Sequence, residues 1–236
     1  MLEADLLFVG KCVFLHAENN ELKMVASFTA VGKCVFLHAE NNMIQPMTHD
    51  PVERHPLQPF LPPHAHMLML GSFPPARKRW CMDFFYPNFI NDMWRIWGLV
   101  CFGDKQHFVD EQHKCFRREQ IIQFLEHEGI ALFDTATAVV RTTNTASNTD
   151  LLVVEQTDVA ALLRQLPECT AVVTTGQKAT DLLTTLFHIE SQPKVGGYVE
   201  FTFEGRAMRL YRMPSSSRAY PMKLERKAEL YSVLKQ

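Results

Sequence analysis

The chain has 236 residues, of which 47% are hydrophobic, and this is enough for one sizeable buried core. A formal net charge of -2 excludes a globally basic nucleic-acid binder and a disordered polyelectrolyte. No apolar run reaches the roughly 18 residues that a membrane-spanning helix needs, and the early acids Glu3 and Asp5 do not fit a secretory signal, so we expect a cytoplasmic protein.

An unchanged repeat lies near the N-terminus. The sequence VGKCVFLHAENN fills residues 9–20 and recurs at residues 31–42. Structural repeats diverge because only their packing is constrained, so identical copies indicate a recently duplicated stretch. The two copies are either a pair of hairpin-like interaction segments or an upstream region translated in frame. We favour the second interpretation and divide the chain into a duplicated leader, residues 1–42, and a single domain, residues 43–236.

A proline-rich segment precedes the first predicted core strand. Five prolines between Pro51 and Pro63 favour an extended arm. The apolar run from Met67 to Leu70 is then closed by Gly71 and a pair of prolines, which predicts a buried strand ending in a turn. Functional groups can gather at the carboxyl end of such a strand.

Further elements alternate along the rest of the chain. Apolar residues at three- and four-residue spacing predict helices at 91–100, 117–128, 158–166 and 177–186. Short apolar or β-branched runs predict strands at 130–133, 170–174, 198–203 and 208–213. This alternation predicts an α/β protein, a three-layer α/β/α sandwich with a short, mostly parallel central sheet.

Five segments in order carry a resemblance to a known family: LGSFPP (70–75), FFYPNFINDMW (84–94), GIALFD (129–134), VVTTGQKA (172–179) and MPSSSRAY (213–220). The set resembles the uracil-DNA glycosylase superfamily and looks closest to its mismatch-specific and hypoxanthine-DNA glycosylase branches. The similarity runs from about Glu53 to the C-terminus. It implies a DNA repair enzyme that works as a monomer on damaged double- or single-stranded DNA, with no cofactor.

The first motif and the aromatic cluster after it predict a base pocket. Gly71 allows close backbone approach, and Pro74 stiffens the turn so that Ser72 and Phe73 can present backbone amides and a ring to a planar group. A flipped base also needs a flat apolar face, for which the candidates are Phe85 or Tyr86. The alternatives are a structural turn and ordinary core aromatics.

Two polar residues are candidates for the chemistry. Asn91 opens a predicted helix and could be its N-cap. The resemblance makes it the functional residue, one that holds a water or hydrogen-bonds the flipped base. Asp134 follows a predicted strand and could orient the sugar, the water or a loop, or could cap the next segment. Thr175 adds to the base pocket, where relatives often have asparagine or another base-reading residue.

The MPSSSRAY segment resembles the superfamily's second motif, a loop that enters the minor groove and contacts phosphates. The resemblance makes Met213, followed by Pro214, the apolar wedge, and the serines the phosphate contacts. Arg218 stands where proline is more usual. From Arg206 onward eight basic residues face two acidic ones, which predicts a local positive surface. The predicted DNA contacts are Met213, Pro214, Ser215, Ser216, Ser217 and Arg218.

The sequence gives little support for a metal site, a serine esterase or a nucleotide-binding enzyme. The histidines, His55 among them, pair with no cysteine or carboxylate at ligand spacing, so we expect surface or structural roles and no metal. No GxSxG, Walker A or GxGxxG motif occurs. The polar loop 141–150 offers Ser147, Asn148 and Asp150 as further contacts. We expect a monofunctional glycosylase that removes uracil or hypoxanthine, with a non-catalytic DNA- or nucleotide-binding relative as the alternative.

Overall fold

The computed structural model describes residues 6–9, 12–15, 25–27, 51–141 and 151–235. The chain separates into two units, Met1–His49 and Asp50–Gln236. In the first unit β1 (Leu6–Val9), β2 (Cys12–Leu15) and β3 (Val25–Ser27) pair as an antiparallel sheet. Residues of the first repeat copy form β2, whereas the second copy lies outside the described residues. The division between leader and domain at residue 42 therefore stays a prediction.

Removal of the leader tests that division. A chain that begins at Met43 should melt within a few degrees of the full chain, because every strand and helix of the second unit starts at Val52 or later. Thermal unfolding followed by circular dichroism would measure the difference. Insolubility of the shortened chain, or loss of its cooperative transition, would show that the leader covers core surface.

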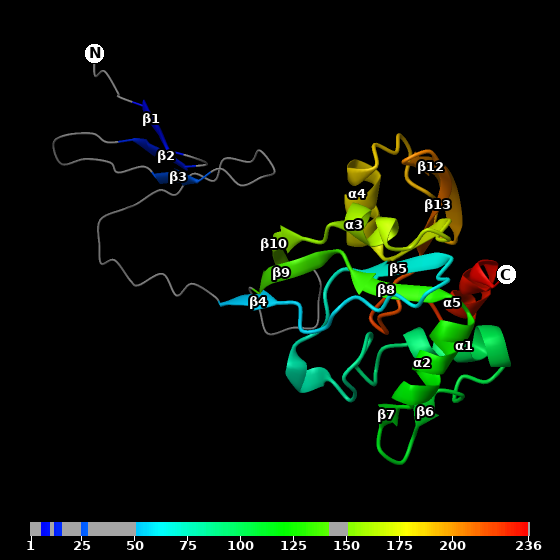
Figure 1. Cartoon of the computed structure of the whole chain (residues 1–236). Coiled ribbons are helices and arrows are strands. Elements are labelled where there is room, and N and C mark those ends of the chain that lie inside the picture. The colour runs from blue at the N-terminus through cyan, green and yellow to red at the C-terminus, as the bar shows by residue number, and fades with distance from the viewer. Residues whose placement is uncertain (1–5, 10–11, 16–24, 28–50, 142–150, 236) are drawn as a thin grey trace. The chain divides into compact units, whose positions relative to one another are not determined.

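A five-stranded sheet forms the centre of the second unit, in the order β12-β13-β11-β5-β8 (Figure 1). The pairs β13–β11, β11–β5 and β5–β8 are parallel, and only the edge strand β12 runs antiparallel to its neighbour. All the predicted strands occur, and the mostly parallel sheet is confirmed. Their bounds are β5 (Met67–Gly71), β8 (Ile130–Asp134), β11 (Ala171–Thr175), β12 (Gly197–Phe203) and β13 (Arg206–Met213).

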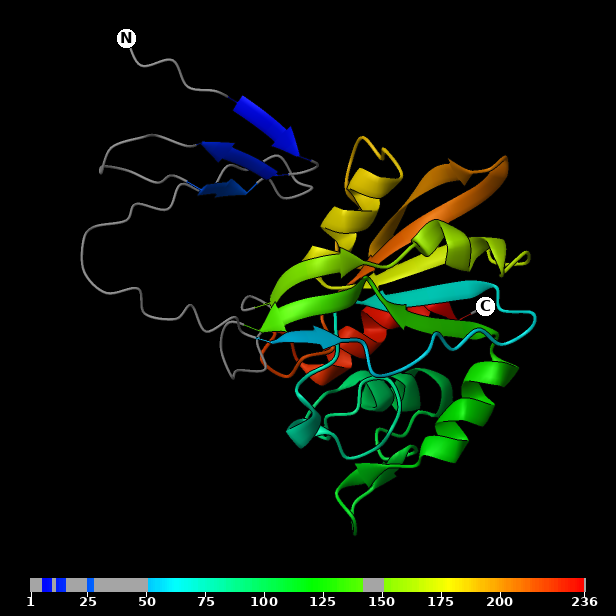
Figure 2. The ribbon, with the colours of Figure 1, turned by 60° about the vertical axis from the view of Figure 1, so that its left-hand side comes forward.

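Helices cover both faces of this sheet, which confirms the three-layer sandwich. Helices α3 and α4 lie on one face, and α1, α2 and α5 lie on the other (Figures 1 and 2). No helix in the described part of the chain is long and apolar enough to cross a membrane. The helix α5 was not predicted. The bounds are α1 (Met93–Phe102), α2 (Arg118–His127), α3 (Val159–Arg164), α4 (Gln177–Leu186) and α5 (Leu224–Tyr231).

A second, smaller sheet was also not predicted. It contains β4 (Val52–Arg54), β9 (Ala136–Arg141) and β10 (Leu151–Gln156), all antiparallel in the order β10-β9-β4. The proline-rich arm follows β4 and runs along β8, where Phe60 and Leu132 exchange backbone hydrogen bonds of 3.0 and 2.9 Å. A short hairpin of β6 (Val109–Asp110) and β7 (Cys115–Phe116) and two 3₁₀ helices, Arg77–Arg79 and Ser232–Leu234, are the remaining elements in the described part of this unit.

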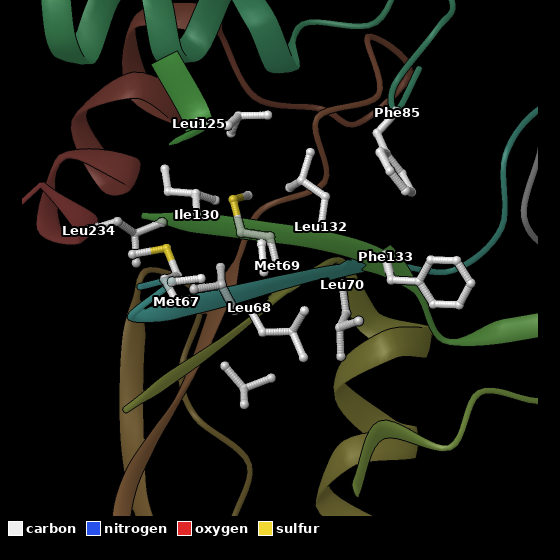
Figure 3. Close-up of a cluster of buried hydrophobic side chains, with 14 of the residues drawn as sticks. Met67, Leu68, Met69, Leu70, Phe85, Leu125, Ile130, Leu132, Phe133 and Leu234 are labelled. Carbon is white, nitrogen blue, oxygen red and sulfur yellow. The ribbon is translucent and has the colours of Figure 1, made fainter. Parts of the chain in front are cut away.

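The hydrophobic core surrounds β5, an inner strand of the sheet that pairs with β11 and β8. Its side chains alternate between the two faces, with Met67 and Met69 toward Leu125 of α2 and with Leu68 and Leu70 on the opposite face (Figure 3). All four β5 side chains are fully buried. Packing on both faces fixes the strand, so the residue at its carboxyl end, Gly71, occupies a rigid position.

Candidate functional site

The carboxyl ends of the parallel strands bring three of the resembling segments to one edge of the sheet. In the strand register Gly71 is the partner of Asp134, and Thr175 is the partner of Met213. The strands that carry the segments LGSFPP, GIALFD and VVTTGQKA therefore end side by side, and the MPSSSRAY segment starts next to these strand ends. This edge is where a parallel α/β sheet normally places its ligand.

Tyr86 extends from the aromatic segment to the same edge. Its hydroxyl lies 3.2 Å from Oγ1 of Thr175. A Cβ atom added to Gly71 would lie 3.6 Å from this hydroxyl and would collide with Oδ1 of Asp134. The glycine is therefore required because the Asp134 carboxylate, rather than a ligand, packs directly against the strand backbone. Gly71, Tyr86, Asp134 and Thr175 form one group, which we call the strand-end cluster.

Tyr86 has an unusual backbone and a neutral hydroxyl. Its φ of 50° lies in the left-handed region, which a bulky residue adopts only where its surroundings impose it. Burial and the nearby charge of Asp134 raise the pKa of its hydroxyl above the usual value. The hydroxyl therefore stays protonated at neutral pH. Phe85 is buried against Phe133, so of the two candidate stacking rings only Tyr86 is partly exposed.

The GSFPP turn is held from two sides. Arg141 donates to the carbonyl of Pro74 at 3.2 Å and forms a two-pronged ion pair with Glu53. Trp80 donates to the next proline carbonyl at 2.7 Å. Phe73 is buried against residues of β9, so its ring does not face a ligand as we had expected, whereas Ser72 is partly exposed.

His55 belongs to the site, although the sequence predicted a surface or structural role for it. Its side chain is 3% exposed, and its Nε2 lies 2.9 Å from Oδ2 of Asp134. The imidazole ring packs between Phe73 and Phe133, at centroid distances of 5.4 and 4.7 Å. No local sequence signal marks this residue, because its partner lies 79 positions later in the chain.

Asn91 stands one residue before the N-cap of α1, which is Asp92, so the N-cap role that is the alternative for Asn91 falls to its neighbour. The Oδ1 atom of Asn91 accepts a hydrogen bond of 2.8 Å from the backbone amide of Met93, the first residue of α1. The backbone amide of Asp92 donates to the carbonyl of Ser216 at 2.9 Å. The start of α1 is therefore attached to the serine-rich loop. A role for Asn91 in chemistry stays a prediction.

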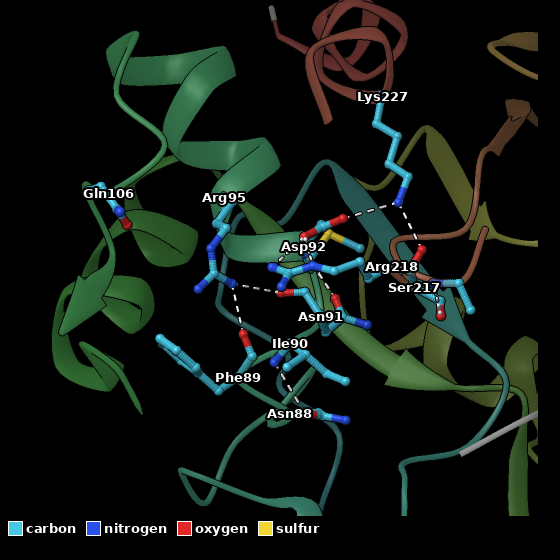
Figure 4. Close-up of polar contacts among 12 residues, drawn as sticks. Asn88, Phe89, Ile90, Asn91, Asp92, Arg95, Gln106, Ser217, Arg218 and Lys227 are labelled. Atoms are coloured by element: carbon cyan, nitrogen blue, oxygen red, sulfur yellow. Dashed lines mark hydrogen bonds and ion pairs between the residues drawn. The ribbon is translucent and has the colours of Figure 1, made fainter. Parts of the chain in front are cut away.

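A cluster of two buried charges, Asp92 and Lys227, and the exposed Arg218 fixes this loop (Figure 4). The Asp92 carboxylate lies 3.2 Å from both the ammonium of Lys227 and the guanidinium of Arg218. Lys227 is fully buried and also donates to the carbonyl of Ser217 at 2.8 Å. Arg95 reaches back to the carbonyls of Phe89 and Asn91. We call Asp92, Lys227 and Arg218 the loop clamp, because they tie α1 and α5 to residues 216–218.

The serine-rich loop is only partly available to DNA. The side chain of Met213 is 0% exposed at the end of β13, so it is a core residue and not the exposed wedge that we expected. Pro214 and Ser216 are also buried, and Ser215 is partly buried. Ser217 and Arg218 are exposed. Of the six predicted DNA contacts, Ser217 and Arg218 are therefore the accessible ones.

The predicted positive surface is smaller than the count of basic residues suggests. The guanidinium of Arg206 donates to four backbone carbonyls between Leu163 and Cys169, and Lys227 is buried in the loop clamp. The predicted contacts Ser147, Asn148 and Asp150 lie outside the described residues. Exposed basic side chains remain at Arg209, Arg218, Lys223, Arg226 and Lys235.

Comparisons with known proteins identify the fold. No family model and no curated protein matches the chain. Among solved structures 16 chains match. One is the solution NMR structure of a protein from Methanosarcina acetivorans named a "putative Uracil DNA glycosylase"; it is 20% identical, has a TM-score of 0.52, and the match covers 79% of this chain and 100% of that one. The chain therefore has a uracil-DNA-glycosylase-like α/β fold.

Proposed function

We propose that this protein is a monofunctional DNA glycosylase that flips uracil or hypoxanthine out of DNA and hydrolyses its N-glycosidic bond. The observation that carries the proposal is the strand-end cluster, in which three separate resembling segments and the Tyr86 hydroxyl meet at the ligand-binding edge of the sheet. The fold of the structural neighbour supports it. We place the protein near the mismatch-specific and hypoxanthine branches, as a cytoplasmic monomer without a cofactor.

The proposed chemistry needs charge stabilisation more than a strong base. The bond from C1′ to the base nitrogen breaks with its electron pair going to the base, and the sugar becomes oxocarbenium-like. The oxygen of a water then bonds to C1′ while its proton passes to solvent. In this reaction the Asp134 carboxylate stabilises the positive sugar. Asn91, whose Oδ1 is occupied by the Met93 amide, offers its NH₂ group to the water or the base.

An abasic-site strand-scission assay tests the proposal directly. Duplexes with a single uracil, hypoxanthine, xanthine, or thymine opposite guanine are incubated with the protein, and alkali then cleaves any abasic site. We expect cleavage of the uracil or the hypoxanthine duplex. Excision by Asn91→Ala at the wild-type rate would remove Asn91 from the chemistry.

A non-catalytic DNA- or nucleotide-binding relative is the second candidate. The core position of Met213 and the hydrogen bond that Asn91 accepts from the Met93 amide favour it, because both residues already have structural roles. Such a protein would bind the same duplexes and leave every one of them intact in the scission assay. Binding without cleavage on all four substrates would therefore select this candidate.

Salt dependence tests the DNA-binding surface. If exposed basic residues neutralise phosphates, log K should fall linearly with log salt, with a slope of about -0.9 per phosphate contact. Arg218→Ala should flatten this slope by about one unit, because its side chain is exposed at the serine-rich loop. Arg164→Ala, which removes an equally exposed arginine paired with Glu204, is the matched control. An unchanged slope in Arg218→Ala would place DNA elsewhere.

A further inference from the structure

We infer that His55 is a positioning residue whose Nε2–H holds the Asp134 carboxylate in its working orientation. The inference rests on the proposed function, in which Asp134 acts on the substrate. The contact joins Nε2 of His55 to Oδ2 of Asp134 at 2.9 Å. Oδ1, the other oxygen, lies against Gly71 and so cannot turn without leaving the strand end. The histidine and the glycine together define one orientation of the carboxylate.

The backbone of Leu57 orients the imidazole of His55 toward Asp134. The Leu57 carbonyl lies 2.9 Å from Nδ1, and the Leu57 amide lies 3.2 Å from the same nitrogen. The carbonyl is the nearer of the two groups and accepts only from a protonated Nδ1, whereas the amide donates only to an unprotonated Nδ1. Both contacts hold the ring so that Nε2 points to Oδ2 of Asp134.

The surroundings of the contact between His55 and Asp134 shield it from water. The side chains of His55 and Asp134 are only 3% and 11% exposed. Aromatic rings of Phe73, Phe85 and Phe133 surround the imidazole, which limits competition from water. The titratable neighbour of the pair is Tyr86, whose hydroxyl stays neutral at ordinary pH because its pKa is raised. The 11% of the Asp134 side chain that is exposed is the part that can meet a substrate.

Two amide replacements separate this role from ring packing. Both His55→Gln and His55→Asn remove the aromatic ring, so they lose the same contacts with Phe73 and Phe133. The glutamine NH₂ can take the place of Nε2 and reach Asp134, whereas the shorter asparagine reaches only the place of Nδ1. We expect His55→Gln to keep most of the single-turnover excision rate and His55→Asn to lose about 10-fold or more.

Binding and stability measurements complete this comparison. The duplex Kd should be unchanged in both variants, because the exposed residues of the serine-rich loop are untouched. Melting temperatures should fall by similar amounts in the two variants. Equal activity of the glutamine and asparagine variants, whether high or low, would overturn the positioning role.

A spectroscopic readout does not depend on glycosylase activity. Long-range ¹H–¹⁵N spectra of the full chain report which nitrogen of His55 carries a proton. We expect a proton on Nε2 on both sides of neutral pH, with a chemical shift that moves in Asp134→Asn. A neutral ring with its proton on Nδ1 would overturn the inference. A protein that excises none of the bases but keeps the Nε2 proton would refute the proposed function alone.

Discussion

Gly71→Ala should lower base excision by about 100-fold while leaving most of the stability intact. The added Cβ would collide with Oδ1 of Asp134, and the nearest alternative contact, the Tyr86 hydroxyl, lies 3.6 Å away. The backbone φ of Gly71 is outside the left-handed region, so alanine adds no conformational strain. The end of a side chain can move aside, and the carboxylate must retreat by on the order of 1 Å. The substitution therefore lowers the excision rate, by moving the carboxylate, much more than it lowers the stability. Single-turnover kinetics and thermal unfolding would measure the two effects.

Gly197→Ala is the matched control for this prediction. Gly197 also lies in a strand with an ordinary φ, and its added Cβ would meet only the Lys194 carbonyl at 3.4 Å, a normal contact distance. Its excision rate should equal that of the wild type. Wild-type activity in Gly71→Ala would mean that the position of Asp134 does not matter, and the strand-end cluster would lose its assigned role.

Asp92→Asn should destabilise the protein by about 3–5 kcal/mol, because it leaves the ammonium of Lys227 buried without a compensating charge. Lys227 is fully buried, and its other bond is to the carbonyl of Ser217. For a unit of this size the loss corresponds to a fall in Tm of roughly 10 °C. Chemical denaturation would measure the free energy of unfolding.

The loop clamp also predicts an asymmetry between its two buried partners. Lys227→Met should cost less than Asp92→Asn, because Asp92 keeps its ion pair with Arg218 at 3.2 Å. In the double variant the second change should cost little, since removing both charges leaves none unpaired. Glu155→Gln breaks an exposed pair with Arg54 at the same distance of 3.2 Å and should cost less than about 1 kcal/mol. An equal loss in Glu155→Gln and Asp92→Asn would contradict this account.

The layers of the fold could be predicted from the sequence because hydrophobic periodicity is local. Helix α4 occupies its predicted bounds, Gln177–Leu186. Helix α1 starts at Met93, two residues later than predicted, because Asp92 is its N-cap and Asn91 lies outside the helix, where its side chain accepts from the Met93 amide. Strand β10 was missed because Leu152, Val153 and Val154 are all exposed, so its apolar residues do not alternate between a buried and an exposed face.

The polar contacts of the site could not be predicted in the same way. His55 meets Asp134 across 79 positions, and Lys227 meets Asp92 across 135. A single sequence carries no periodic signal for such pairs, and composition places a lysine on the surface by default. Met213 lies in the core because, like Leu210, it belongs to the apolar strand β13. The resemblance identified the segments that meet, whereas only the structure shows which side chains face inward.

The inner position of β5, between β11 and β8, also determines when the site can assemble during synthesis. Strand β5 is the first strand of the large sheet to be made, but both of its neighbours, β8 and β11, come later in the chain. Until they emerge from the ribosome, the apolar segment MLML has two unpaired edges, a state that is prone to aggregation. The loop clamp closes only after α5 has been made. A nascent chain therefore has no complete site, and its folding depends on contacts between distant segments, which form slowly.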